Sequence, residues 1–169
     1  PRTTAPTTAP GRPPTGPSLL PDGWYSVVAA DAAFRAELPS SPRVTTPLVS
    51  GPTGTVPRVE YNAPGPAGSQ VSVTSVPAPL DGHTADEILD GAAGQIRRDV
   101  GGILHLGDRS TVDGAPARRF VVDVRSGRIL GLVVHRGATL HLVSVFEPAG
   151  AGPGPAAAFE RVASTFHLL

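Results

Sequence analysis

The sequence predicts an α+β domain in which helices pack on an antiparallel β-sheet meander. Residues 109–147 alternate apolar and polar side chains in four strand-like segments that short turns connect. Residues 84–100 change to an apolar spacing of about four residues, which is typical of a helix. Residues 156–169 carry a second helical stripe. A chain of 169 residues is long enough to bury one core of its own.

The composition excludes several classes of function. The 14 basic residues, all arginine, balance 14 acidic residues, so the chain has no general attraction for nucleic acid or anionic membranes. Cysteine and lysine are absent, which excludes disulfides, thiolate metal sites, P-loops and Schiff bases. Methionine is absent even at position 1, so we expect a fragment or a processed form from which any targeting signal has been removed. No apolar run reaches the length of about 18 residues that spans a bilayer.

Residues 1–21 are predicted to form a disordered stalk or linker, and residues 22–169 a single α+β domain. The first segment, PRTTAPTTAPGRPPTGPS, has no aliphatic side chain larger than alanine and cannot bury enough surface to order itself. A Pro-rich chain of this kind extends at roughly 3.1 Å per residue, or on the order of 50 Å in total. We therefore expect it to hold the domain away from a membrane anchor.

The N-terminal half contains four predicted strands, at residues 24–28, 34–38, 58–63 and 69–76. A Pro/Gly-rich loop that extends to about Pro57 separates the second strand from the third. The segment PGPAG forms the turn between the last two strands. The strands therefore precede the first helix in the chain.

Residues 84–100 form the first predicted helix. Thr84 followed by Glu87 is a capping box, which satisfies two amides that would otherwise lack a partner. Gly101-Gly102 ends the helix. The apolar stripe consists of Ile88, Leu89, Ala92, Ala93, Ile96 and Val100.

The second half is predicted to be the meander, with strands at residues 109–112, 117–125, 128–135 and 138–147. The turns are placed at Asp113-Gly114, Ser126-Gly127 and Arg136-Gly137. One face then carries Phe120, Val122, Val124, Ile129, Val133, Leu140, Leu142 and Phe146. The other face is mixed and is expected to be partly covered too; it carries Arg119, Val121, Asp123, Leu132, Val134, His141, Val143 and Val145.

The closing helix is predicted to begin at Pro155, which suits a first helical turn. Its buried stripe consists of Phe159, Val162, Ala163 and Phe166. All five phenylalanines fall at predicted core positions: Phe34, Phe120, Phe146, Phe159 and Phe166.

Residues that carry chemistry are scattered. The segment DGHTADE, residues 81–87, is the nearest approach to a metal motif, but His83 precedes the helix and does not share a helical face with Glu87. Acidic residues in a first helical turn are explained by the helix dipole. His105, in a loop or short strand, His135, His141 and His167 show no ligand spacing. We therefore expect no metal, no cofactor and no catalytic residues, with a Ser–His–Asp triad assembled by the fold as an open alternative.

Two groups of residues are candidates for partner binding. The arginines of the meander favour an anionic or acidic partner, although solvated strand ends explain them equally well and they do not form one patch. An exposed aromatic pair near the N-terminus favours a ligand platform, although its tryptophan also suits a position that closes the core. The candidates are Arg118, Arg119, Arg125, Arg128, Trp24 and Tyr25.

The order of several motifs adds a family resemblance. A Trp-Tyr strand, FRAELPSSP (34–42), DGAPARRF (113–120), RGATLHLV (136–143) and F-x-x-x-x-S-T-F (159–166) occur in sequence around the capped helix. This pattern resembles the secreted or lipid-anchored actinobacterial domains of the PsbP-like, LpqN-type α/β/α sandwich. The resemblance implies an antiparallel sheet with helices packed on it, located outside the cytoplasmic membrane. Relatives of this fold act mainly as binding or assembly subunits and share no catalytic set.

These observations lead us to expect a non-enzymatic, extracytoplasmic binding or adaptor domain, tethered at the cell envelope by its stalk. Its partner is a protein or a small apolar ligand rather than nucleic acid, membrane contact is limited to an N-terminal anchor, and the domain is a monomer. One alternative is a carrier that holds a lipid or other small molecule in a cavity between sheet and helix. The other is the hydrolase with a Ser–His–Asp triad.

We expect that deleting residues 1 to about 20 will leave the melting temperature essentially unchanged, because these residues have no side chain that can anchor a core. Differential scanning calorimetry of the two chains measures this. A drop of several degrees would show that the segment packs on the domain.

Overall fold

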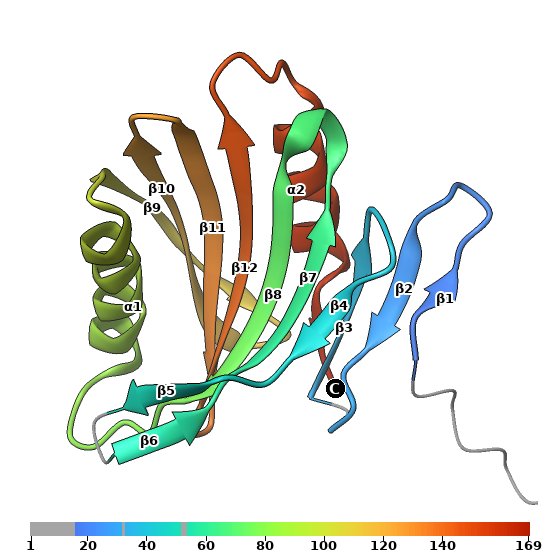
Figure 1. The fold of residues 1–169 in the computed structure, drawn as a ribbon. Coiled ribbons are helices and arrows are strands. Elements are labelled where there is room, and N and C mark those ends of the chain that lie inside the picture. Colours follow the sequence, from blue (N-terminus) through green and yellow to red (C-terminus); the bar gives the residue numbers. More distant parts are fainter. Residues whose placement is uncertain (1–15, 32, 52–53) are drawn as a thin grey trace, which may run out of the picture.

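Seven antiparallel strands form the main sheet, in the order β4-β7-β8-β12-β11-β10-β9 (Figure 1). The computed structural model describes residues 16–31, 33–51 and 54–169. The predicted stalk therefore lies largely outside the described residues. The strands are β4 (Arg43–Thr45), β7 (Val59–Pro64), β8 (Gln70–Pro77), β9 (Ile103–Val112), β10 (Ala115–Val124), β11 (Gly127–Arg136) and β12 (Thr139–Pro148).

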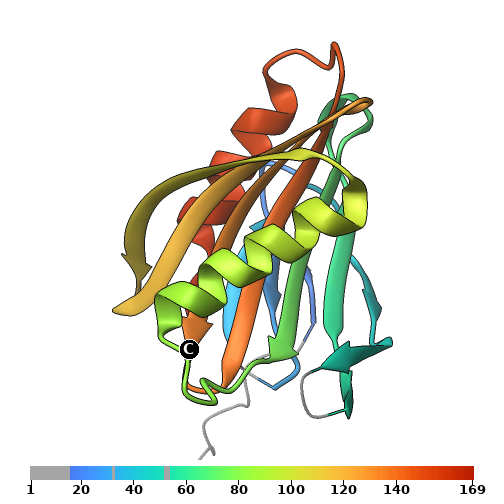
Figure 2. The same cartoon turned by 90° about the vertical axis from the view of Figure 1, so that its left-hand side faces the viewer.

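Three layers result from packing on both faces of this sheet. Helix α1 (Ala85–Val100) lies on one face, and helix α2 (Gly154–Thr165) lies on the other (Figures 1 and 2). A small second sheet lies beside α2; its strands are β1 (Ser18–Leu19), β2 (Tyr25–Val28), β3 (Phe34–Leu38) and β13 (His167–Leu168). The predicted α+β sandwich, with helices on an antiparallel sheet, is confirmed.

The two faces of the meander are as predicted, although the pairing of its strands is shifted by two residues. Val122 lies opposite Ile129, and Ile129 lies opposite Phe146, so the α1 face is the predicted apolar face. Asp113 and Gly114 both have positive φ and form the tight turn between β9 and β10. The other two turns are displaced by one residue from their predicted positions, to residues 125–126 and 137–138. Gly127 is instead a strand residue, where a Cβ would collide with the Glu147 carbonyl oxygen.

Helix α1 begins and ends as predicted. The Thr84 hydroxyl accepts the Glu87 N–H, and the Glu87 carboxylate accepts the Thr84 N–H at 2.7 Å. Gly101, at φ +67°, provides the left-handed C-cap. Leu89 and Ala93 are fully buried. The predicted stripe fails only in the last turn, where Val100 is 42% exposed.

Two parts of the N-terminal prediction are corrected. The loop predicted up to Pro57 contains β4 and a hairpin of β5 (Leu48–Gly51) and β6 (Gly54–Pro57). Leu48 is exposed, so the hairpin has no clear burial signal in its sequence. Strand pairing also starts before the predicted domain boundary at residue 22, because Ser18 lies opposite Ser26 in the small sheet.

Two further corrections concern β9 and the C-terminus. β9 is six residues longer than the predicted strand at 109–112 and includes His105. Helix α2 ends at Thr165, and His167–Leu168 then pair with β3. The Asp113 carboxylate accepts the Leu168 N–H at 2.9 Å, which fixes the chain end to the β9–β10 turn.

The core consists of two packed clusters, one on each face of the main sheet. Four phenylalanines are buried as predicted, whereas Phe146 is only half-buried. Phe120 lies under α1 with its ring directly over Gly131 on the neighbouring strand, where any Cβ would overlap the ring. The glycine therefore makes room for the largest side chain of the α1 cluster.

Replacing Phe120 with alanine should destabilise the fold by about 3–5 kcal/mol, because the change leaves a cavity between α1 and the sheet. Arg125→Ala, in an exposed turn, should cost less than about 0.5 kcal/mol. Urea unfolding of both variants measures the two free energies. Equal destabilisation would contradict this assignment of the two faces of β10.

Candidate functional site

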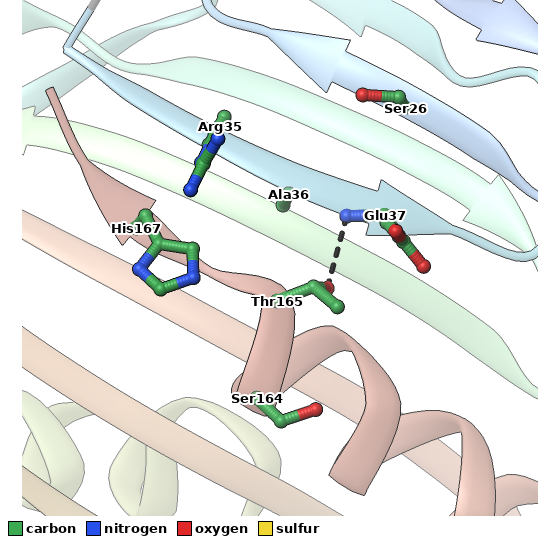
Figure 3. A pocket seen from close by; sticks show the side chains of 7 residues that line it. All are labelled: Ser26, Arg35, Ala36, Glu37, Ser164, Thr165 and His167. Carbon is green, nitrogen blue, oxygen red and sulfur yellow. Dashed lines mark hydrogen bonds between the residues drawn. The ribbon is translucent and has the colours of Figure 1, made fainter.

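Three hollows of similar size open on the surface of the described chain. The first, the polar pocket, has a volume of about 260 Å³ and lies where β2 and β3 meet the C-terminal end of α2 (Figure 3). Its lining residues are Ser26, Arg35, Ala36, Glu37, Ser164, Thr165 and His167. The Thr165 hydroxyl accepts the Glu37 N–H at 3.1 Å. The carbonyl end of a helix carries partial negative charge, so this position opposes the binding of an anion despite Arg35 and His167.

The second hollow, the α1 groove, has a volume of about 350 Å³ and lies beside α1 on the part of the sheet that the helix leaves open. Its floor is aliphatic, from Val76, Val133, Leu140 and Leu142, together with Ala92 and Ile96 of the helix. Its polar side carries Arg58, Glu60, Ser72, Thr74, Gln95, Asp99 and Ser144. The carboxylate of Glu60 already has Arg58, Thr45 and Asn62 as partners. This groove lies within a sheet face, where the backbone groups are occupied by neighbouring strands.

The third hollow, the α2 groove, has a volume of about 310 Å³ and runs from the edge strand β9 across β10 and β11 to α2. Its apolar side chains come from Val121, Leu130, Ala156 and Phe159, and it is also bordered by Leu106 and Phe120, although the side chain of Phe120 packs under α1. Its lip carries His105, Arg119, Arg128 and Glu160. This groove combines an apolar floor, a charged lip and a sheet edge, and we take it as the candidate functional site.

Each basic side chain at the lip of the α2 groove has a carboxylate partner. Arg119 donates two hydrogen bonds to Glu160, at 2.6 and 3.0 Å, and its guanidinium lies 5.5 Å from the centre of the Phe159 ring. Arg128 donates to Glu147 at 3.2 Å. His105 Nε2 lies 3.0 Å from the Asp123 carboxylate. The lip is therefore polar but carries no unpaired arginine.

The structure brings together only two of the six residues predicted from the sequence for partner binding. Arg119 and Arg128 line the α2 groove. Arg118 lies on the opposite face, where its side chain is 14% exposed and its Nε is 3.1 Å from Asp90 of α1. Arg125 is exposed in the β10–β11 turn. The four arginines thus do not form one patch.

The predicted aromatic pair lies in the small sheet, away from the α2 groove. Trp24 is half-buried, packs against the core and has the Arg161 guanidinium 4.1 Å above its ring. Arg161 also pairs with Asp22 and Glu37, and its bond to Asp22 lowers the pKa of that carboxyl. Tyr25 is half-buried beside it. Trp24 therefore closes the core at the edge of the small sheet and is covered by an arginine.

One serine and one histidine meet inside the fold, but among the described residues no acid forms a hydrogen bond to this histidine. The Ser75 hydroxyl lies 2.8 Å from His141 Nδ1, and both residues are buried. Phe34 and Phe166 pack against the imidazole. Asp31 affects His141 only through its charge, and its carboxylate accepts the Ala33 N–H. The hollow that reaches Ser75 has a volume of only about 90 Å³.

Metal binding and membrane spanning each require a particular structural feature. Within the part of the chain that the structure describes, no group of three or more His, Cys, Asp or Glu side chains gathers in a way that could hold a metal ion. No helix among residues 16–31, 33–51 and 54–169 is both long and apolar enough to cross a lipid bilayer.

Comparisons with known proteins identify the fold but no family. No sequence family matches the chain, and no curated protein does. Among solved structures, the fold is similar to that of the PsbP protein CyanoP from the cyanobacterium Synechocystis sp. PCC 6803. The TM-score is 0.57 at 15% sequence identity, and the likeness covers 96% of this chain and 98% of that one. The chain therefore has a PsbP-like fold.

The buried His141 should make the stability depend on pH. Burial lowers the pKa of His141; Asp31 opposes this, while Arg136 and His135 act in the same direction. As the pH falls through the ordinary histidine value of about 6.5, the unfolded chain takes up a proton that the folded chain excludes. The free energy of unfolding should therefore fall between about pH 7.5 and pH 5.

Urea unfolding of the wild-type chain and of His141→Phe at these pH values checks the expectation. His141→Phe leaves Ser75 without its partner and lowers stability at every pH, but it should flatten the slope. His105→Asn, at an exposed position, should retain the wild-type slope. If the His141→Phe variant keeps the full pH dependence of the unfolding free energy, groups other than His141 cause that dependence.

Proposed function

We propose that this chain is a non-enzymatic binding or adaptor domain that acts at the cell envelope, outside the cytoplasmic membrane, on a Pro/Thr-rich stalk. The observation that carries the proposal is the open α2 groove, with its apolar floor and ion-paired lip, beside a packed interior. A surface of this kind suits recognition of another molecule. In the described part of the chain, no acid forms a hydrogen bond to the Ser75–His141 pair, and the hollow beside it is too small for a substrate, which favours binding over hydrolysis.

The packed interior favours an adaptor over a carrier. A carrier needs an enclosed cavity of several hundred cubic ångströms between sheet and helix. Here both sheet–helix interfaces are filled by side chains, with Leu89, Phe120 and Val122 on the α1 side and Val143, Phe159 and Val162 on the α2 side. The three larger hollows open on the surface. The partner is therefore proposed to be a protein that contacts the outside of the domain.

The location outside the cytoplasmic membrane rests on the sequence. The Pro/Thr-rich N-terminal segment is typical of exported spacers, and the motif order resembles secreted or lipid-anchored domains of this fold. The PsbP-like fold is compatible with a subunit that binds to a larger assembly. Its likeness to CyanoP concerns the fold alone, because the identity is 15%.

Site-specific photo-crosslinking in the producing organism tests the proposal. A photoreactive phenylalanine replaces either His105, at the α2 groove, or Arg43, an exposed residue on the opposite edge strand. We expect the position in the α2 groove to form a crosslink with one discrete protein in the envelope fraction, and the Arg43 position to form none. Protease added to spheroplasts should degrade the domain.

Three outcomes would contradict the proposal. Resistance to added protease would place the domain in the cytoplasm. A lipid that co-purifies with the chain, detected by native mass spectrometry, would favour the carrier. The same products from both crosslinking positions would show that the α2 groove has no special role.

A further inference from the structure

The long edge strand β9 gives the α2 groove a second feature that recognises a partner. β9 is the outermost strand of the main sheet and pairs only with β10 among the described residues (Figure 2). A paired strand uses the backbone groups of one side, so its outer side presents a row of N–H and C=O groups. Eight of its ten residues are exposed. Such an edge fits an extended chain, because only a strand presents complementary groups at the same spacing.

A β-bulge divides this edge into two parts. Between Leu106 and Arg109 the register with β10 shifts, so Gly107 and Asp108 lie opposite Arg119 alone. A Cβ at Gly107 would lie 3.0 Å from the Arg119 carbonyl oxygen, so glycine permits this close approach. Beyond the bulge, Asp108 and Arg109 protect the edge with charges, as edge strands commonly do. The part before the bulge, residues 103–106, has no carboxylate and no arginine.

The unprotected part is also the part that borders the α2 groove. Ile103 and Leu106 are 66% and 41% exposed, which is unusual for aliphatic side chains on a strand. His105 and Leu106 line the groove, whose floor includes Val121, Leu130 and Phe159. A strand laid along residues 103–106 would direct alternate side chains toward the groove face of the sheet. The edge and the groove therefore form one surface.

The charges at the lip select the occupant. Arg119, Arg128 and His105 each have a carboxylate of this chain within 3.2 Å. A charged side chain entering the groove would have to displace one of these pairs and lose its own hydration. An uncharged apolar side chain needs neither change and gains burial against Leu130 and Phe159. The surface thus favours an extended peptide with an apolar anchor.

We infer that the domain binds its partner by strand addition: an extended peptide segment of the partner pairs with β9 at residues 103–106 and places one uncharged apolar side chain in the α2 groove. The inference rests on the proposed binding function and specifies its site. Backbone hydrogen bonds supply general affinity, and the α2 groove supplies selectivity for the anchor.

Selection of random dodecapeptides displayed on phage against the purified chain tests the inference. We expect enrichment of peptides that alternate in strand fashion and carry one aliphatic or aromatic anchor without charge. Ala156→Trp, which fills the groove, and Leu106→Lys, which places a charge on the edge, should each weaken binding of an enriched peptide by about tenfold or more. Fluorescence anisotropy measures the dissociation constants.

Each variant has a matched control, in which the same new side chain is introduced at a position outside the proposed site. Ala157→Trp adds the same side chain at the next, exposed position of α2. Thr111→Lys adds the same charge to β9 beyond the bulge. Both should bind like the wild type. Enriched peptides that are charged, that bind all four variants equally, or that bind at the α1 groove would overturn the inference, as would the absence of enrichment.

The two experiments separate failure of this inference from failure of the proposed function. A position-specific crosslink at His105 together with no strand-like peptide in the selection would retain the binding function and reject strand addition. Self-association of the chain through β9, seen as a dimer in sedimentation that Leu106→Lys abolishes, would also reject a partner peptide.

Discussion

The fold depends on burying both faces of the central strands β11 and β12. Six consecutive residues of β11, from Leu130 to His135, are all buried, including Gly131, which lies beneath Phe120. A strand covered on one side alternates buried and exposed residues, whereas this strand is covered on both sides. One layer above and one below are therefore required, and α1 and α2 with the small sheet supply them.

The surface hollows are a consequence of this requirement. Helix α1 contacts β9, β10 and β11, whereas α2 contacts β12 and β11. Because the two helices are offset across the seven strands, each face keeps an uncovered area beside its helix. The α1 groove lies over β7, β8 and β12, and the α2 groove lies over β9 and β10. Of these two grooves, as the described residues form them, the α2 groove is the one lined by the long edge strand β9, and this gives it features for recognising a chain.

A similar fold at 15% identity is expected when such layer constraints dominate. Many different sequences can supply the alternation of apolar and polar residues, the helix caps and the tight turns. The sandwich can therefore be kept while the sequence changes. Side chains at the lip of a groove are under no such constraint. Arg119 with Glu160 and Arg128 with Glu147 are therefore properties of this chain, and the proposed function depends on them rather than on the fold.

Local signals in the sequence determined the helix α1 with its capping box, the two faces of the meander strands and the core positions of Phe120, Phe159 and Phe166, because periodicity and caps act over a few residues. The alternation also placed Arg118 and Arg119 on opposite faces. Their partners, Asp90 of α1 and Glu160 of α2, were decided only by how the helices dock. The same holds for the edge position of β9, the bulge at Gly107 and the bond from Leu168 to Asp113. These features join residues that are far apart in the sequence, and no pattern within a few neighbouring residues encodes contacts of that kind.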